Sequence, residues 1–274
     1  MTFNKWMPDS SMEEGIKNFL NTNWLGKEMK VFSCCDSTNI RLQEFAGSGV
    51  KEGFVVISKE QTLGQGRNGR NWSSPKGECI AISLLLRPEF APQCASMLTL
   101  LAGLSVFSAL EQNGVGNLAI KWPNDIVAEG KKICGILTKM CTQKDAIQYV
   151  IVGTGINVNQ KSFPPELQDI ATSVYLQTKE EKSKEKIIAD YLSAFEHYYE
   201  IFLKTEDLSG VKEEYNQKLV HLNSMVSLMD GEGKKTAKAL GINEKGELLV
   251  EEPSGERRAI LAGEISVRGI EGYV

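Results

Sequence analysis

A glycine-rich loop in the first third of the chain carries side chains that are well suited to bind an anion. Three glycines within residues 64–69 let the backbone adopt positive φ and approach a ligand closely. Arg67 and Arg70 bring planar guanidinium groups that match carboxylate or phosphate oxygens two at a time. Trp72 adds a flat face for stacking. The loop therefore suits an anionic ligand with a planar ring, and a solvated surface loop is the alternative that it leaves open.

The same loop fits the pattern G-x-G-x-x-G, which in dinucleotide-binding folds joins a strand to a helix. Here the β-prone run 53–58 precedes the loop, and a second strand-like run, 79–86, follows it. The order strand, loop, strand provides no helix N-terminus to hold a pyrophosphate. The acidic residue expected about 20 positions later would be Glu89, which stands beside a proline. We therefore reject a dinucleotide site.

Two more polar residues stand where apolar residues are expected. Lys121 ends a short β-prone run and is followed directly by Trp-Pro-Asn-Asp. Asn157 interrupts the apolar run 149–158, and a buried amide must find hydrogen-bond partners. The lysine is also compatible with a solvated strand end, and the asparagine with a β-bulge or turn. Neither residue identifies a site by itself.

The composition is typical of a globular protein and excludes several functional classes. The chain has 274 residues, of which 42% are hydrophobic and 24% are charged, enough for one large domain and a small one. The net charge of −4 argues against a general nucleic-acid binder. We find no apolar run long enough to cross a bilayer and no apolar signal core near the N-terminus. We therefore expect a cytoplasmic protein with neither nucleic acid nor membrane as a partner.

The cysteines and histidines do not indicate a metal site. Six cysteines are present without a C-x-x-C pair, and the two histidines, His197 and His221, are far from them in sequence. Most of the cysteines lie within apolar runs. We expect buried, reduced thiols and no metal held by the protein alone.

The elements that must position these groups alternate between helices and strands. Helical patterns are expected over 11–21, 39–46, 92–112, 179–204 and 208–219. Strand patterns are expected over 29–34, 53–58, 79–86, 117–121, 126–127, 133–140 and 148–158. After residue 223, turn-forming segments at 230–233, 243–246 and 253–255 separate short β-prone runs and indicate a small all-β module. The sequence thus predicts an α+β fold with a mixed sheet and helices over about 28–220.

Six segments, taken in order, resemble the motifs of biotin protein ligases. They span residues 35–39, 61–72, 121–125, 132–137, 153–157 and 263–268. Their shared order is far more specific than any one of them, and the resemblance covers about residues 30 to 270. It implies a catalytic domain over 1–220, with a fold like that of class II synthetases, and an SH3-like β-barrel over 221–274. The chain is similar to the monofunctional type, biotin–acetyl-CoA-carboxylase ligase without an N-terminal DNA-binding domain.

The resemblance also implies a two-step reaction with ATP as a substrate and Mg²⁺ as its companion. The biotin carboxylate attacks the α-phosphorus of ATP, giving biotinyl-5′-AMP and pyrophosphate. A lysine amine of a biotin carboxyl carrier domain then attacks the acyl carbonyl, and AMP leaves. The first step brings two anions together, so cations must offset their repulsion. A glycine loop that closes over the reactive intermediate would keep water out.

Carried over by position, the family's site residues form two groups. The biotin site is expected to contain the side chains of Ser37, Thr38, Asn39 and Gln61, whose donors and acceptors match a ureido ring, and the backbone of Gln65 and Gly66. Arg67 and Lys121 are expected to be catalytic and to hold the biotin carboxylate and the phosphate. The nucleotide site is expected to contain Arg70, Trp72 stacked on adenine, Asn157, and Arg268 reaching the phosphates. The resemblance names no protein ligand for Mg²⁺, although Asp125 is conceivable.

One departure and several alternatives remain. Many relatives carry Arg where this chain has Gln65, so the loop has one cation fewer. A bifunctional ligase and DNA-binding repressor is the first alternative, but about 28 residues before the first core strand are too few for a winged helix-turn-helix. A ligase for another carboxylate, such as lipoate, and a non-catalytic binding module are the others. We expect a monomer or a homodimer.

Overall fold

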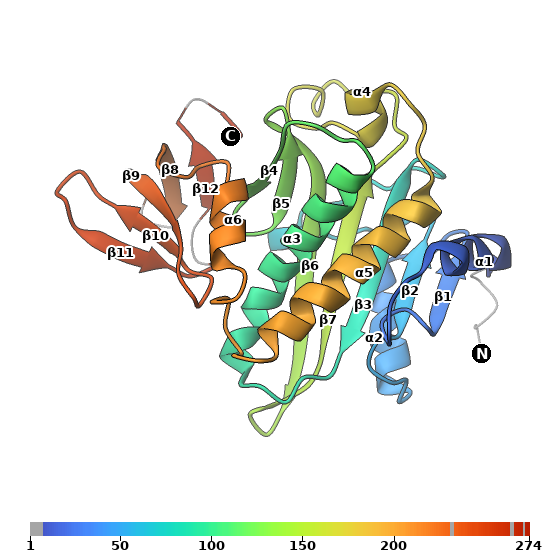
Figure 1. Cartoon of the computed structure of the whole chain (residues 1–274). Coiled ribbons are helices and arrows are strands. Elements are labelled where there is room, and N and C mark those ends of the chain that lie inside the picture. The colour runs from blue at the N-terminus through green and yellow to red at the C-terminus, as the bar shows by residue number, and fades with distance from the viewer. Residues whose placement is uncertain (1–7, 231–232, 264–265, 271) are drawn as a thin grey trace.

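The computed structural model describes residues 8–230, 233–263, 266–270 and 272–274 and contains two β-sheets (Figure 1). The larger sheet has the strand order β1-β2-β3-β7-β6-β5-β4. Its strands are β1 (Met29–Phe32), β2 (Val55–Ser58), β3 (Cys79–Leu86), β4 (Leu118–Lys121), β5 (Asp125–Ala128), β6 (Lys131–Gln143) and β7 (Ala146–Asn157). β1 and β2 are parallel, and the other neighbours are antiparallel. The predicted α+β fold with a mixed sheet is confirmed.

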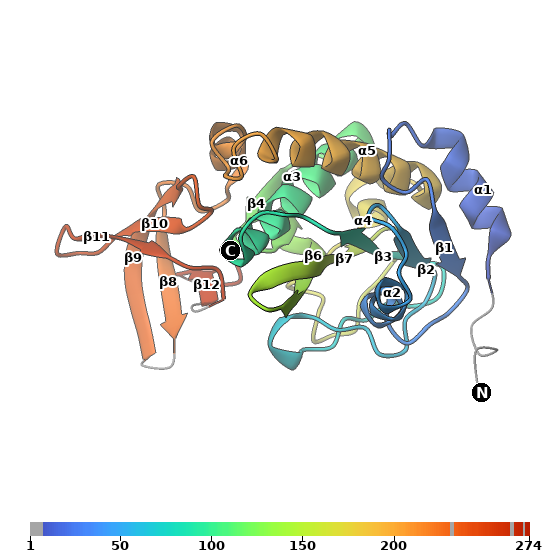
Figure 2. The same cartoon turned by 90° about the horizontal axis from the view of Figure 1, so that it is seen from below.

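Helices cover both faces of this sheet, as the layers in Figure 2 show. The helices are α1 (Ser10–Phe19), α2 (Thr38–Gly47), α3 (Met97–Gln112), α4 (Val174–Thr178), α5 (Lys184–Phe202) and α6 (Lys212–Lys218), with 3₁₀ turns η1 (Arg67–Gly69) and η2 (Pro92–Ser96). α3 and α5 pack side by side over one face, and α2 lies on the other. Because both faces are covered, every residue of β3 is buried, which explains its unbroken apolar sequence.

The segment Pro92–Gln112, formed by η2 and α3, corrects one expectation from the sequence. By length and apolar composition it could cross a bilayer, whereas the sequence analysis found no such run. In the fold, 72% of its most apolar window is buried inside the protein, as in the core helix of a globular protein. Its apolar surface therefore packs against the sheet and α5.

Helix α5 is shorter than its sequence pattern because its start is fixed by local caps. Lys179 takes a left-handed conformation that ends α4, and the hydroxyl of Ser183 accepts the Lys186 backbone N–H to begin α5. Farther along α5, the buried carboxylate of Glu196 accepts three backbone N–H groups, from Asn23, Trp24 and Leu25. This carboxylate fastens the loop after α1 to the body of the protein.

The smaller sheet forms a separate module after α6, in agreement with the predicted SH3-like architecture. Its order is β11-β10-β9-β8-β12, and every neighbouring pair is antiparallel. The strands are β8 (Met225–Asp230), β9 (Gly233–Ile242), β10 (Leu248–Glu251), β11 (Arg257–Ile260) and β12 (Ser266–Gly269). Parts of the predicted turn at 230–233 and of the motif at 263–268 lie outside the described residues. The predicted domain boundary at 220 falls between α6 and β8.

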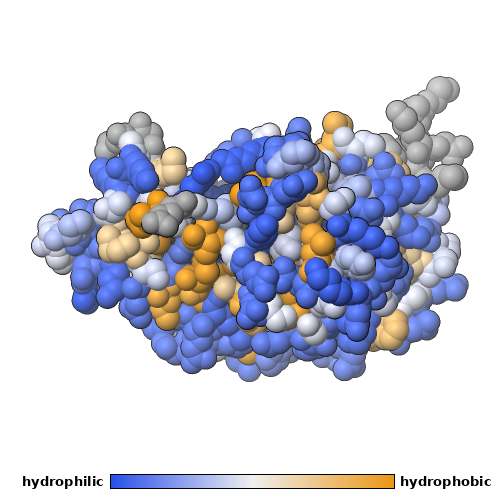
Figure 3. Space-filling model, turned by 90° about the horizontal axis from the view of Figure 1, so that it is seen from above, coloured by the Kyte–Doolittle hydropathy of each residue, from blue (hydrophilic) through white to orange (hydrophobic). Residues whose placement is uncertain are grey.

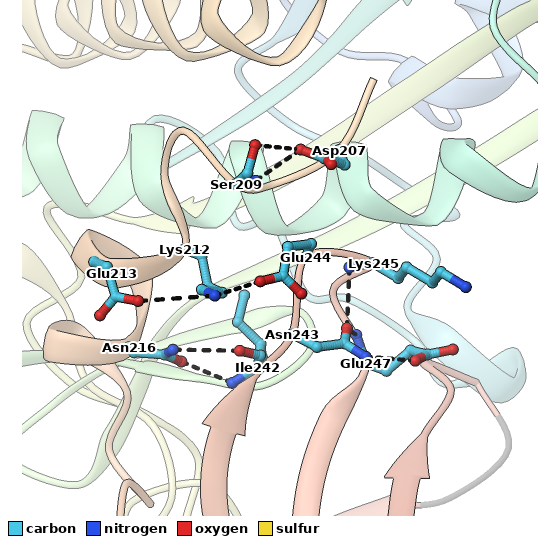
Figure 4. Close-up of polar contacts among 10 residues, drawn as sticks. All are labelled: Asp207, Ser209, Lys212, Glu213, Asn216, Ile242, Asn243, Glu244, Lys245 and Glu247. Carbon is cyan, nitrogen blue, oxygen red and sulfur yellow. Dashed lines mark hydrogen bonds and ion pairs between the residues drawn. The ribbon is translucent and has the colours of Figure 1, made fainter. Parts of the chain in front are cut away.

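The predicted turn at 243–246 is one of the places where this module contacts the rest of the chain. Close to α6, an ion pair and side-chain hydrogen bonds join the two parts, as Figure 4 shows. The contacts are Lys212 with Glu244, the Asn216 amide with both backbone groups of Ile242, and the Trp122 indole N–H with the Gly246 carbonyl at 3.0 Å. Several large apolar side chains of the module are exposed. The face in Figure 3 is mainly hydrophilic, and its apolar residues form separate groups.

Candidate active site

Two adjoining cavities lie against the large sheet on the side of α2 and the glycine loop. The smaller has a volume of about 50 Å³ and the larger about 490 Å³. Among the described residues, five line both cavities and form their border, namely Gly66, Arg67, Trp72, Asn124 and Lys132. A ligand in one cavity would therefore meet a ligand in the other beside these residues.

Glycines in β6 and β7 create the floor of the smaller cavity. Residues two apart in a strand share a face, so Gly153 and Gly155 point the same way, and Gly135 pairs with Gly155 on the next strand. A Cβ at Gly153 would lie 2.3 Å from the amide oxygen of Asn39. A Cβ at Gly155 would lie 2.4 Å from the indole of Trp72. The motif at 153–157 thus needs glycine because side chains from α2 and the loop rest directly on the strand backbone.

The smaller cavity carries a connected set of donors and acceptors. The Gln61 amide oxygen accepts the Thr38 backbone N–H at 2.8 Å, and the Thr38 hydroxyl lies 3.2 Å from the same oxygen. The Ser83 hydroxyl lies 2.8 Å from the Thr38 hydroxyl and 2.7 Å from the Asn39 amide oxygen. Ser37 also lines the cavity. The structure therefore brings together the four side chains predicted to contact a ureido ring.

Ser83 belongs to this set, and the sequence analysis did not single it out. It is fully buried in β3, where it is the one hydroxyl in the run Cys79–Leu86. A polar side chain inside such an apolar run must find hydrogen-bond partners, so the sequence position of Ser83 could have indicated a buried polar site.

Arg67 and Lys132 place two cations at the border between the cavities. Arg67 donates to the Asn124 amide oxygen at 2.7 Å, and burial lowers its pKa. The Lys132 ammonium lies 2.6 Å from an Asp125 carboxylate oxygen and 5.5 Å from the centre of the Trp72 ring. Lys132 is the first residue of the motif at 132–137, but no role was predicted for it from the sequence. The structure makes it a border cation.

Lys121 lies on the side of the larger cavity, and its predicted contact with the biotin carboxylate and the phosphate stays a prediction. It lines the larger cavity but not the smaller one. Its ammonium donates to the Val267 carbonyl of β12 at 2.9 Å and lies 4.5 Å from the ring centre of Tyr273. Only 7% of Lys121 is exposed, and its burial lowers its pKa to about 8, although Asp125 favours the charged form. Lys121 joins the catalytic part to the C-terminal module.

The loop residue Gln65 replaces an expected arginine, and a lysine lies beside it. Gln65 lines the smaller cavity, and its amide oxygen accepts a hydrogen bond from the Lys139 ammonium at 2.8 Å. Gly66 lines both cavities, as expected of a backbone that borders the ligand. A cation from β6 therefore stands next to the position where the family resemblance led us to expect an arginine.

The predicted nucleotide residues all reach the larger cavity. Arg70, Trp72, Asn157 and Arg268 line it, although they come from the loop, from the end of β7 and from β12. The Asn157 amide is already engaged, since it donates to the Thr172 carbonyl at 3.0 Å and accepts from Gln160 at 3.1 Å. The buried indole N–H of Trp72 has no partner among the described residues. Stacking of Trp72 on adenine remains a prediction.

Comparison with known proteins agrees with this geometry. Residues 31–157 match the Biotin/lipoate A/B protein ligase family, and residues 221–268 match the biotin protein ligase C terminal domain. The chain is 35% identical over 253 residues to the bifunctional ligase/repressor BirA of Bacillus subtilis, covering 92% of this chain and 78% of the relative. It is 29% identical to the biotin–acetyl-CoA-carboxylase ligase of Paracoccus denitrificans, covering 85% of this chain and 98% of the relative.

A solved structure of a biotin protein ligase is also similar to this chain. The biotin protein ligase from Aquifex aeolicus, in complex with biotin and ATP, is 35% identical and superposes with a TM-score of 0.78 over 89% of this chain and 99% of that one. The similarity to these relatives covers both the catalytic part and the C-terminal module. The chain therefore belongs to the biotin protein ligase family and is a ligase of that type.

Proposed function

We propose that the chain joins biotin to ATP as biotinyl-5′-AMP and then transfers the biotinyl group to a lysine of a biotin carboxyl carrier domain. The observation that carries this proposal is the border between the cavities, where Arg67 and Lys132 lie beside both. A carboxylate reaching out of the smaller cavity would meet the α-phosphate of a nucleotide in the larger one at this place. The structure of a relative with both biotin and ATP bound supports the pairing of ligands.

The smaller cavity is suited to the ureido head of biotin. Amide and hydroxyl side chains offer both donors and acceptors, and the bonds through Ser83 fix Thr38 and Asn39 before any ligand arrives. A ligand that lacked the ureido groups would leave these buried atoms without partners, which disfavours it. This argues for biotin over lipoate as the substrate.

The border cations would lower the barrier of the first step. As the carboxylate approaches the phosphate, negative charge accumulates between them, and fixed cations in a water-poor site stabilise that charge strongly. Arg67 is held by Asn124, and Lys132 by Asp125, so both are oriented before reaction. The carboxylate oxygen forms the new bond to the α-phosphorus, and pyrophosphate leaves.

Magnesium would arrive with ATP rather than occupy a site made by the protein alone. Within the described ranges, no three His, Cys, Asp or Glu side chains gather to hold a metal ion. Asp125 is the one carboxylate that lines the larger cavity in the described part of the chain. Both oxygens of this carboxylate already have partners, Tyr273 on one and Lys132 on the other, so the phosphates would hold the ion, which would offset pyrophosphate charge.

The glycine loop must move for biotin to enter. The smaller cavity is far below the roughly 300 Å³ of a usual small-molecule site. Several of its lining residues belong to the loop, which is closed by bonds from Gly66 to Arg70 at 2.7 Å and from Trp72 to Gly64 at 2.9 Å. Opening and reclosing of this loop would admit biotin and then shield the intermediate from water.

Exchange of labelled pyrophosphate into ATP tests this function. We expect exchange that depends on biotin, is not supported by lipoate, and falls at least about a hundredfold in Lys132→Met, the usual loss for one oriented electrostatic group. Lys51→Met, which removes an exposed lysine that lines neither cavity, is the matched control and should exchange normally. Exchange supported by lipoate but not by biotin would refute the assignment of the substrate.

A further inference from the structure

The described residues 272–274 lie beside β12 and at the wall of the larger cavity. Gly269, the last residue of β12, touches the backbone of Val274 so closely that a Cβ there would lie 2.2 Å from the Val274 carbonyl carbon. The φ of Gly269 is not in the left-handed region, so the need for glycine is purely one of space. This contact holds Tyr273 against the active site, where it lines the larger cavity.

Tyr273 contacts two charged groups of the site at once. Its hydroxyl donates to the Oδ2 atom of Asp125, and its ring centre lies 4.5 Å from the Lys121 ammonium. The other carboxylate oxygen of Asp125 contacts Lys132 at 2.6 Å and the Asn124 amide at 3.1 Å. One carboxylate thus stands between Tyr273 and the border cation Lys132.

The size of the larger cavity shows whether Tyr273 positions neighbouring groups or blocks the nucleotide. With the Tyr273 ring in place, the larger cavity still has about 490 Å³, within the range of roughly 300–1,000 Å³ that small-molecule sites occupy. Arg67, Arg70 and Arg268 still line it. A residue that excluded nucleotide would fill this volume, whereas Tyr273 forms part of its wall.

We propose that Tyr273 is a positioning residue for the adenylation step, acting through Asp125 on Lys132. This inference rests on the proposed function. While the tyrosine hydroxyl occupies one carboxylate oxygen, Asp125 holds Lys132 by the other oxygen alone. Without that hydroxyl, the carboxylate is free to turn both oxygens toward Lys132, which draws the ammonium away from the border and weakens its effect on the reacting anions.

The protonation state of Tyr273 agrees with this role. Burial, and after it the neighbouring charge of Asp125, raises the pKa of Tyr273 above its usual value. The hydroxyl therefore keeps its proton under ordinary conditions and remains a donor to the carboxylate.

Two variants test the proposal by different routes. Tyr273→Phe keeps the ring over Lys121 and removes only the donor to Asp125. Gly269→Ala leaves Tyr273 intact but pushes away the segment that carries it. Tyr149→Phe is the matched control, because Tyr149 also lies under a cation, Arg87, but lines neither cavity.

The measurements are kcat and KM for ATP in biotin-dependent pyrophosphate exchange, Kd for biotin, and thermal unfolding. We expect Tyr273→Phe to lower kcat on the order of tenfold, the effect of one lost bond to a charged group, with KM for ATP changed less than about twofold. Gly269→Ala should lower kcat at least as much, while Tyr149→Phe matches the unaltered chain. Biotin affinity and unfolding temperature of Tyr273→Phe should stay unchanged.

Three results would overturn this proposal alone, and a fourth would overturn it together with the proposed function. An unchanged kcat in Tyr273→Phe would show that the hydroxyl has no part in the step. A lower KM for ATP or faster exchange would make the segment a barrier to nucleotide instead. A loss that only follows a smaller folded fraction would make Tyr273 structural. Absence of biotin-dependent exchange in the unaltered chain would overturn the proposed function together with this inference.

Discussion

Replacing Lys121 with methionine should stabilise the fold near neutral pH. Lys121 is 7% exposed, and its ammonium has one hydrogen bond, to the Val267 carbonyl, together with the face of the Tyr273 ring. Burial disfavours its charge most, and nearby Lys132, Arg268 and Arg67 disfavour it further, whereas Asp125 favours it. Methionine has a similar length and an apolar, adaptable side chain, so Lys121→Met should fill the same space without a buried charge.

The size of the effect follows from the lowered pKa. A fall from 10.5 to about 8, at about 1.4 kcal/mol per pH unit, means that charged Lys121 costs the fold about 3 kcal/mol at pH 7. Loss of the bond to Val267 and of the contact with the ring offsets about 2 kcal/mol of that. We therefore expect Lys121→Met to raise the free energy of unfolding by about 1 kcal/mol at pH 7.

The pH dependence is the sharper part of this prediction. Because the folded-state pKa of Lys121 is below the unfolded value, the unfolded chain binds more protons between about pH 8 and 10.5, and the stability of the unaltered protein rises there. The cost of the charge is complete below about pH 8 and fades as pH rises. By about pH 9.5 roughly 2 kcal/mol of it is gone, so the advantage of Lys121→Met should turn into a deficit of about 1 kcal/mol.

Urea unfolding at pH 7 and at about pH 9.5 measures both effects, with Lys51→Met as the exposed control. Pyrophosphate exchange by the same variant should be slower, since Lys121 lines the larger cavity. A variant less stable than the unaltered protein at pH 7, or a difference that is the same at both pH values, would refute this account of Lys121.

Four further predictions concern other parts of the molecule. Gly155→Ala should weaken biotin binding at least about tenfold, as measured by calorimetry, while the fold stays intact. The reason is that the new Cβ would lie 2.4 Å from the Trp72 indole and displace it. Unchanged affinity would mean that Trp72 does not shape the site. Glu196→Ala leaves three backbone N–H groups without their acceptor and should cost about 3 kcal/mol in urea unfolding, with kcat per folded molecule preserved. Arg268→Ala should raise KM for ATP in pyrophosphate exchange while the biotin Kd stays the same, because its expected partner is phosphate; ATP kinetics like those of the unaltered chain would remove it from the site. Amide hydrogen exchange of residues 61–72 should slow when biotinyl-5′-AMP binds, and equal exchange with and without the ligand would exclude this loop as a gate.

Much of the fold was predictable because burial leaves a clear pattern in the sequence. The apolar run of β3 and the Leu- and Ala-rich pattern of α3 correspond to elements that are buried almost all round. The polar residues of the smaller cavity were found by resemblance, and the structure gives their physical basis, a shared set of hydrogen bonds.

The contacts that Lys132 and Lys121 make could not be predicted from the sequence. Neighbouring residues of a strand point to opposite faces, so the direction of Lys132 depends on the register between β5 and β6. That register shifts between Ile126 and Val127, and such an irregularity re-aims the side chains beside it. Lys121, by contrast, is directed to β12, which is more than a hundred residues later in the chain. The periodicity of a single strand predicts neither the direction of Lys132 nor the contact of Lys121 with β12.

The position of Tyr273 at the active site could not be predicted from the sequence either. It stands in a short segment without a periodic pattern, and its partners Lys121 and Asp125 are distant in sequence. Contacts of this kind arise only after the C-terminal module has packed against the catalytic part.

Direct detection of the intermediate tests the central claim of a biotin-activating site at the border of the two cavities. The protein is incubated with biotin, ATP and Mg²⁺ without an acceptor, and the nucleotides bound to it are analysed by mass spectrometry after rapid gel filtration. We predict that biotinyl-5′-AMP accumulates on the unaltered protein and on Lys51→Met in about one equivalent per folded molecule, and that it is nearly absent from Lys132→Met. An intermediate formed equally well by Lys132→Met would contradict the role of the border, and no biotinyl-5′-AMP on the unaltered protein would contradict the proposed reaction.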